Sequence, residues 1–264
     1  MLLKKNGKQK AKIDPRSLNL SNYFSEDSFR ATPNQHDWTK IKRTDWGVYD
    51  NDRLNNCTCV AAAHMLKCWT ANAKTESTIS DDEILEAYSN ITGYNAATGE
   101  GDAGAYTIDT LKYWRKNGIG PHKIKAFATV PHDNRDVVKT AIYFFGGIYV
   151  GLQLPKSILG QEIWSVLPGD LVDDREPYSW GGHAVTILAY DEEHLTCVTM
   201  GIEQKMTWEF WETYNDEAYA IITDDFFNGS ETPSGLSLKA IQDDLLKLTG
   251  QKIRLGKQME NPFC

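Results

Sequence analysis

One abrupt change of composition at residue 57 most constrains how this chain of 264 residues folds. The polar, turn-prone stretch 51–56 (Asn-Asp-Arg-Leu-Asn-Asn) ends there, and the helix-forming stretch 57–66 (Cys-Thr-Cys-Val-Ala-Ala-Ala-His-Met-Leu) begins. This pattern predicts a buried helix with Cys57 in its first turn. The positive end of a helix dipole favours a thiolate, which is the form of cysteine that attacks a carbonyl carbon. The sequence therefore predicts a nucleophilic cysteine at a helix N-terminus.

Hydrophobic periodicity and capping residues predict helices first and strands afterwards. We expect helices over 57–73, 80–91, 107–116 and 136–145, strands over 148–154, 183–190, 195–200 and 218–223, a short helix over 207–214 and a glycine-rich surface loop over 93–105. This order predicts an α+β domain over residues 33–224, with a helical part at about 57–146 and an antiparallel sheet part at about 147–224. Residues 1–32 are expected to form an irregular basic lead-in, and residues 225–264 a linker and a C-terminal helix at 237–249.

Charge is unevenly distributed along the chain. The net charge is −8, yet the first twelve residues hold five lysines and no acid, so the remainder is more acidic than this total indicates. An acidic body argues against nucleic acid as a partner. We expect the lysine-rich tail to be solvated, the alternative being contact with an anionic surface.

Neither a membrane span nor a signal peptide is expected. No apolar run approaches the roughly 18 residues of a spanning helix, and only Met1 to Leu3 precede polar residues at the N-terminus. The five cysteines are irregularly spaced, which indicates a reducing compartment rather than a disulfide framework. A cytoplasmic location is the expectation, with association with a virion as an alternative.

A nucleophilic cysteine requires a base, and His183 is the best candidate among the six histidines. It follows Gly181 and Gly182 and opens an apolar strand, where glycines allow another backbone or a ligand to come close. His64 lies on the same helix as Cys57 but about 10 Å further along the axis at 1.5 Å per residue. That distance excludes His64 as the partner of the thiol.

Two groups of motifs resemble the papain-like cysteine peptidases, over about residues 33–223. Upstream are Pro33, Asp37-Trp38, an amide at Asn51 and the helix-opening Cys57 followed by alanines 61–63; downstream are His183-Ala184-Val185, Ala189-Tyr190 and a second strand ending at Met200-Gly201. His183 follows Cys57 by 126 positions, close to the roughly 130–150 of this family. The stretches 51–71 and 180–183 also resemble a phage and bacterial branch of this family.

The resemblance implies a papain-like fold with an active-site cleft between the two parts of the domain. It implies that Cys57 is the nucleophile, that His183 is the base and acid, and that Asn51 stands where the family has its oxyanion-hole glutamine. The family's orienting asparagine falls on Thr199, or on Val198 if the hairpin contains a gap. A hydrolase acting on peptides or proteins through an acyl-enzyme follows, with no cofactor and no metal, although the same residues also serve acyl transfer.

Two departures from the family pattern support an alternative to an active enzyme. Asn51 is one methylene shorter than glutamine, and a Thr199 hydroxyl holds an imidazole less firmly than an amide does. They favour a catalytically weak or inactive papain-like protein with a structural or binding role, for instance in a phage particle. Secreted members of the family carry a long inhibitory pro-segment, for which 56 residues before Cys57 leave no room, so we expect a narrow substrate range or another restraint.

A metal site in the first helix is a weaker alternative. It contains Cys57, Cys59, His64 and Cys68. Only His64 and Cys68 are spaced to share an ion on one helix face, and two ligands do not make a structural zinc site.

Overall fold

The computed structural model describes residues 7–12, 14, 17–20, 26–41, 45–75, 77–228, 230–235 and 239. The predicted C-terminal helix at 237–249 lies almost wholly outside these residues. Within the described ranges, no helix is both long enough and apolar enough to cross a membrane.

Within the described ranges, six α-helices form where the sequence provides caps and buried faces. They are α1 (Glu26–Ala31), α2 (Cys57–Asn72), α3 (Asp81–Thr92), α4 (Thr107–Lys116), α5 (Arg135–Phe145) and α6 (Trp208–Tyr214). A reciprocal capping box between Ser80 and Glu83 begins α3, and Gly146 ends α5 in the left-handed conformation. The five predicted helices within the described residues are confirmed to within one or two residues at each end.

In the part of the chain that the structure describes, nine strands form one mixed sheet. They are β1 (Leu18–Asn19), β2 (His36–Asp37), β3 (Ile124–Thr129), β4 (Ile148–Leu154), β5 (Ile163–Trp164), β6 (Gly181–Tyr190), β7 (His194–Thr199), β8 (Ile202–Thr207) and β9 (Asn215–Thr223). Their order is β1-β3-β9-β4-β6-β7-β8-β5, with β2 paired to β6. The pairs β1/β3 and β5/β8 are parallel, and the other pairs are antiparallel.

Strand β3 corrects the predicted division into a helical part and a sheet part. It lies between α4 and α5, inside the residues expected to be helical, and pairs with β9 near the other end of the domain. Its run Ile-Lys-Ala-Phe-Ala-Thr is short and buried on both sides, so it lacks the alternation that identifies a half-exposed strand. Sequence order therefore does not separate the two parts, because β3 joins them.

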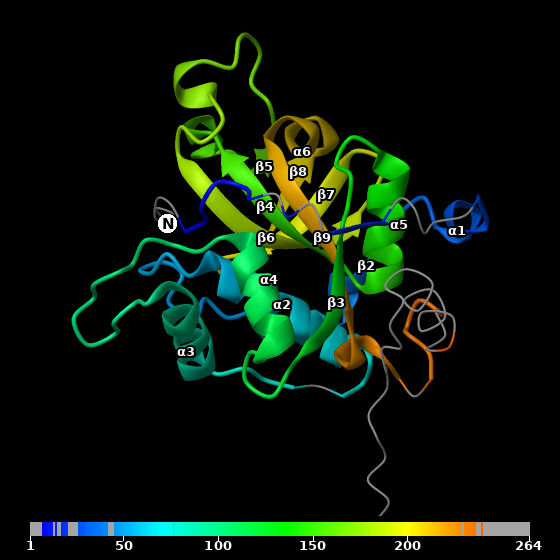
Figure 1. Cartoon of the computed structure of the whole chain (residues 1–264). Coiled ribbons are helices and arrows are strands. Elements are labelled where there is room, and N and C mark those ends of the chain that lie inside the picture. Colours follow the sequence, from blue (N-terminus) through cyan, green and yellow to red (C-terminus); the bar gives the residue numbers. More distant parts are fainter. Residues whose placement is uncertain are drawn as a thin grey trace, which may run out of the picture.

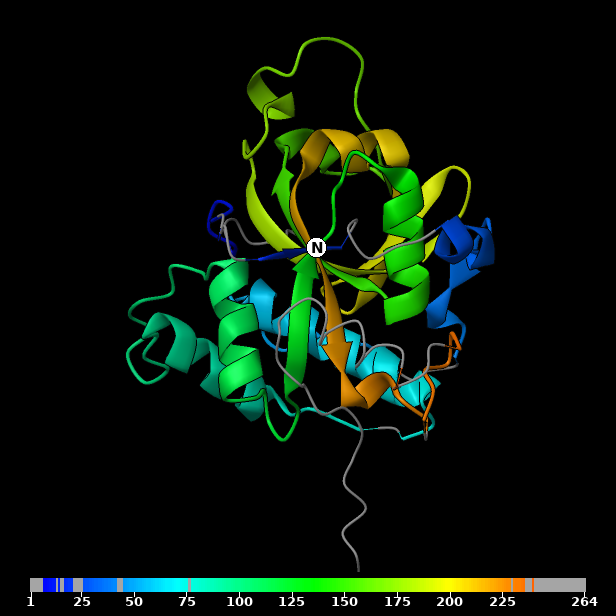
Figure 2. The same cartoon turned by 45° about the vertical axis from the view of Figure 1, so that its right-hand side comes forward.

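The helices α2, α3 and α4 lie together below the main sheet in Figure 1, while α5 lies along its flank and α6 at its far end. Figure 2 shows the same separation from a second direction. Helix α2 packs against β6, and one continuous hydrophobic core includes side chains from both elements. The first residue of α2 and the start of β6 are thereby brought together at one edge of this contact.

The lysine-rich lead-in differs from the solvated tail that we expected. Lys8 is 3% exposed, and Leu18 and Asn19 form β1 against β3. In Figure 1 the dark blue N-terminal trace crosses in front of the central strands of the sheet. The prediction of a solvated tail is wrong for Lys8, because the body of the protein supplies the anionic surface that it contacts.

Candidate active site

Cys57 is the first residue of α2 and is 1% exposed. The backbone N–H of Ala184 donates a hydrogen bond to its Sγ at 3.3 Å, and the N–H groups of Cys57 and Thr58 are also directed at the sulfur. The sulfur thus lies between the N-terminus of one helix and the start of one strand, as the sequence predicted. Each of these donors favours negative charge on the sulfur.

His183 stands beside this cysteine on β6, adjacent to Ala184. Its Nε2 is 2.8 Å from the Oγ1 of Thr199, the last residue of β7. Of the two positions left open by the sequence, the structure therefore places Thr199, rather than Val198, against the imidazole. Because Nε2 is engaged by Thr199, Nδ1 is the ring nitrogen that this contact leaves available.

The side chain of Asn51 is buried but committed to its own loop. Its Nδ2 donates to Asn56 Oδ1 at 3.0 Å and to Leu54 O at 3.3 Å, and Asn56 Nδ2 donates to Tyr49 O at 2.8 Å. These hydrogen bonds hold the turn that leads into α2. Asn51 therefore fixes the position of Cys57, and its role as an oxyanion donor stays a prediction.

Asp102 ties the glycine-rich loop 93–105 to the turn before Cys57. Its Oδ1 accepts hydrogen bonds from Asn55 N and from Tyr88 Oη, both at 2.8 Å, and Asn55 Nδ2 donates to its backbone oxygen at 2.7 Å. Residues 95–101 of this loop are exposed, as the sequence predicted, while its end at residues 102–105 lies beside Cys57. No local pattern distinguishes the Asp102 carboxylate from the other surface acids.

Residues 7–9 of the chain lie across the site. Lys8 N donates to Gly182 O at 3.1 Å, Ala105 N to Gly7 O at 3.3 Å, and Gln9 N to Ala105 O at 2.9 Å. The segment therefore pairs with the glycine-rich loop on one side and contacts the start of β6 on the other. Backbone hydrogen bonds of this kind also hold extended peptides in clefts.

Glycines make this close approach possible on both sides. A Cβ on Gly7 would lie 2.5 Å from Cys57 Sγ, and a Cβ on Gly182 would collide with the carbonyl oxygen of Lys8. The prediction that the glycines before His183 admit another backbone is confirmed, and that backbone belongs to the chain itself. We expected a narrow substrate range or another restraint in place of a long pro-segment, and these few residues, which cover the sulfur, are a restraint of that second kind.

Burial shifts the pKa values of Cys57 and His183 away from their charged forms. It raises the pKa of Cys57 to about 12, although the surrounding backbone N–H groups act in the opposite direction. It also lowers the pKa of His183 to about 4. At neutral pH the covered site therefore holds a thiol and a neutral imidazole. The thiolate expected from the helix dipole is absent in this state because desolvation outweighs the dipole.

Comparison with known proteins identifies the fold but finds no relative of closely similar sequence. No protein-family model and no curated protein sequence matches the chain. Among solved structures, it is similar to xylellain, a cysteine protease from Xylella fastidiosa, with a TM-score of 0.65 and 18% identity over 84% of this chain and 98% of that chain.

Two further structures show the same similarity. Procathepsin B S9 from Trypanosoma congolense has a TM-score of 0.57 and 14% identity over 82% of this chain and 87% of its own. The Amb a 11 cysteine protease, a ragweed pollen allergen crystallised in its proform, has a TM-score of 0.53 and 17% identity over 77% of this chain and 67% of its own. The chain therefore has the papain-like α+β fold that the sequence predicted.

Proposed function

We propose that this protein is a cysteine peptidase-like hydrolase that cleaves peptide or amide bonds. One observation carries the proposal: Cys57 at the start of α2 lies against the Ala184 N–H of β6, next to a His183 held by Thr199. A nucleophile at a helix N-terminus, a neighbouring base and a residue that orients the base are the three parts such catalysis uses.

The proposed reaction has two stages. His183 Nδ1 removes the thiol proton, Cys57 Sγ attacks the carbonyl carbon, and the developing oxyanion accepts a hydrogen bond from the Cys57 N–H. Collapse of this intermediate expels the amine, which takes the proton back from His183, and a thioester on Cys57 remains. Water then attacks the thioester with His183 again acting as base, so the acid is released and the thiol is restored.

This chemistry requires the covering segment to move. Gly7 occupies the space directly at the sulfur, and a substrate carbonyl needs the same space. Departure of residues 7–9 also restores water to the site, which removes the main cause of the raised pKa of Cys57 and the lowered pKa of His183. The described structure is therefore the closed state of the proposed enzyme.

The alternative, a binding or structural protein with a retired site, is favoured by the same burial. A thiol with a pKa of about 12 beside an imidazole with a pKa of about 4 does not react. The two proposals differ in what happens once the segment is displaced. An enzyme then gains a reactive thiolate, whereas a retired site gains an ordinary exposed thiol.

Labelling with iodoacetamide at pH 6, followed by mapping of the modified cysteine, separates these outcomes. Wild-type protein should label slowly at Cys57, because the sulfur is covered. The Lys8→Ala variant, which lacks the buried anchor of the segment, should label on the order of 100-fold faster than a free thiol, of which under about 1% is ionised at this pH.

Two controls complete the experiment. Adding His183→Ala to Lys8→Ala should abolish the fast labelling. Lys12→Ala should behave as wild type, because the Lys12 side chain is exposed and its contacts with Asp109, at 3.7 Å, and with the Tyr106 ring lie at the surface. Labelling of Lys8→Ala at the rate of a free thiol, unchanged by His183→Ala, would favour the retired site.

A further inference from the structure

The side chain of Lys8 lies in a pocket of the protein body. It is 0% exposed, and its Nζ is 2.8 Å from Asp216 Oδ2 and 3.0 Å from Glu217 Oε1. The same ammonium donates to Gln9 O at 3.0 Å. A fully buried lysine is rare unless it is paired, and here two carboxylates and a carbonyl surround it.

The two carboxylates are consecutive residues of β9, yet both face this pocket. Consecutive strand residues normally point to opposite faces of a sheet. The pairing of β4 with β9 shifts register between Gly151 and Leu152: Gly151 faces Glu217 and Leu152 faces Asn215, so Asp216 is left without a partner. Such a bulge re-aims a side chain, and this one places a second acid beside the first.

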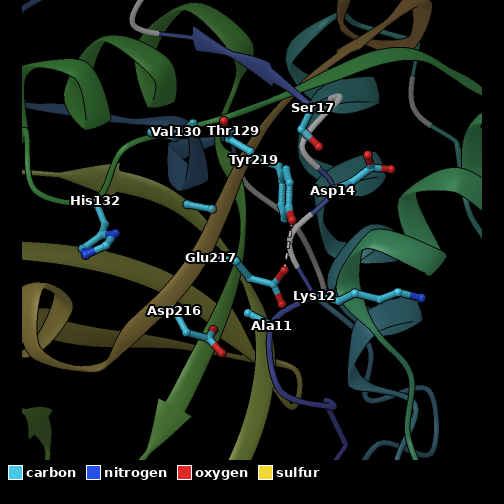
Figure 3. A pocket seen from close by; sticks show the side chains of 11 residues that line it. Ala11, Lys12, Asp14, Ser17, Thr129, Val130, His132, Asp216, Glu217 and Tyr219 are labelled. Carbon is cyan, nitrogen blue, oxygen red and sulfur yellow. Dashed lines mark hydrogen bonds between the residues drawn. The ribbon is translucent and has the colours of Figure 1, made fainter.

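Other residues shape the pocket and keep it charged. Tyr178 Oη donates to Asp216 Oδ2, and Tyr219 Oη donates to Glu217 Oε2 at 3.0 Å. Figure 3 shows Tyr219 directed at the Glu217 carboxylate. Asp216 is next along the strand, and Ala11 of the N-terminal segment lies beside them. A Cβ on Gly151 would collide with the lysine stem, so this glycine makes room for a long side chain.

The pocket has capacity for more hydrogen bonds than an ammonium supplies. Asp216 Oδ1 is buried and has no hydrogen-bond partner among the residues that the structure describes. A guanidinium carries five N–H donors in a plane and binds carboxylates in pairs, so it can satisfy this oxygen as well. Removing any cation would leave two adjacent, largely buried carboxylates without a countercharge, which is unfavourable.

We infer that Asp216, Glu217 and Tyr178 form a specificity pocket that receives a lysine or arginine side chain of a bound peptide, and that Lys8 is its internal occupant in the closed state. Lys8 directly follows the residue at the Cys57 sulfur, so the selected side chain belongs to a residue adjacent to the reacting centre. The substrate class is thus a peptide with a basic residue next to the scissile region. This inference deepens the proposed function and rests on it.

Peptide binding tests the pocket without any turnover. The protein is the full chain with Cys57→Ala and Lys8→Ala, and the probes are fluorescein-labelled Gly-Xaa-Gln peptides with Lys, Arg, Leu or Glu at the central position. The Lys and Arg probes should bind on the order of 30-fold more tightly than Leu, since they complete a buried charge pair, with Arg tightest and Glu weakest.

Two variants of the protein serve as controls. Adding Glu217→Gln should remove most of the preference for the basic probes, while Cys57→Ala with Lys12→Ala, in which Lys8 still fills the pocket, should bind none of the peptides. If the Lys8→Ala protein does not fold, Lys8→Gln replaces it, because glutamine keeps an N–H donor and most of the stem without the charge.

Equal affinity for the Lys and Leu probes, or a preference that survives Glu217→Gln, would overturn the inference. Failure of the proposed function gives a different result. Selective binding of basic probes, together with no cleavage by the Lys8→Ala protein, would support the pocket and contradict the hydrolase proposal. Cleavage of peptides without preference for a basic residue would support the hydrolase proposal and contradict the pocket.

Discussion

Two histidine clusters in this molecule have similar hydrogen bonding and different surroundings. His183 Nε2 meets Thr199 Oγ1 at 2.8 Å, beside Cys57. The second cluster is centred on His122. Its Nε2 lies 2.9 Å from Ser77 Oγ, and its Nδ1 lies 2.8 Å from Asp225 Oδ1. On hydrogen bonds alone, the second cluster is the more complete serine–histidine–aspartate arrangement.

The difference lies in what holds the nucleophile. Ser77 belongs to the loop between α2 and α3, and its own N–H donates to Thr70 Oγ1 at 3.3 Å. Cys57 instead begins a helix, and backbone N–H groups point at its sulfur. The His122 cluster thus links three segments together, whereas the His183 cluster lies next to a cysteine, our proposed nucleophile, whose sulfur accepts backbone hydrogen bonds. A chain of hydrogen bonds by itself does not define an active site.

The largest effect should separate the two clusters directly. In the Lys8→Ala background, His183→Ala should lower kcat/KM for a basic peptide by about 10²–10⁴-fold, the usual contribution of a general base. His122→Ala should leave kcat/KM nearly unchanged and instead lower the free energy of unfolding by about 1–3 kcal/mol, because its partly buried partners Ser77 and Asp225 lose their hydrogen bonds. Steady-state kinetics and urea denaturation of both variants provide the measurement. A comparable kinetic loss in His122→Ala would contradict the distinction.

Stability at low pH should reveal the burial of the imidazole in the cleft. The pKa values of His183 and His64 are about 4 in the fold, below the ordinary 6.5. As pH falls from 6.5 to 4, the unfolded chain takes up protons that these residues cannot accept, so the free energy of unfolding falls by up to about 3 kcal/mol for each. Above pH 6.5 neither residue contributes to the pH dependence.

Urea denaturation of His183→Gln at pH 4 and pH 7 measures how much His183 contributes to the loss of stability at low pH. The variant should lose less stability than wild type between the two pH values, while His132→Gln, which alters an exposed side chain, should match wild type. An identical pH dependence in His183→Gln and wild type would show that the imidazole is not desolvated.

Asn51→Ala should have a smaller effect and should separate its two roles. Both amide protons donate within the turn before α2, so we expect a loss of about 1–2 kcal/mol in the free energy of unfolding and a fall of less than about tenfold in kcat/KM. A fall of about 10²–10³ in kcat would instead establish the oxyanion role, because that is the usual cost of losing such a donor.

Thr199→Val should have the smallest effect. It removes the hydroxyl from His183 while keeping the shape of the side chain, and we expect kcat/KM to fall by about three- to tenfold, the equivalent of one neutral hydrogen bond. Thr199→Ser is the matched control and should retain most of the activity. Thr199→Asn should exceed wild type, since an amide holds the imidazole more firmly.

Local sequence was sufficient for the residues whose environment is set by their own element. Cys57 follows from a helix start, and His183 from a glycine-flanked strand start. Thr199 required only the register of a hairpin, although the shift between Ile187 and Ala189 explains why the sequence left two positions open. In each case a periodic or capping pattern lies within a few residues of the side chain in question.

The covering segment could not be predicted in this way, because its partners are distant. Lys8 meets Asp216 across 208 positions of sequence, and a bulge in β9 that no composition indicates brings the two acids together. The excess of lysine near the N-terminus was visible, but the anionic surface that it matches exists only in the folded protein. The same holds for β3, whose partner β9 lies far along the chain.

The covalent connection between the covering segment and the body gives the closed state one more property. A tethered ligand competes at an effective concentration in the millimolar range, whatever the total amount of protein. Dilution therefore does not open the site, and a free basic peptide must exceed this local concentration or bind more tightly than residues 7–9 do. Opening is a first-order event of a single molecule, and its rate limits how fast a substrate can enter a closed molecule.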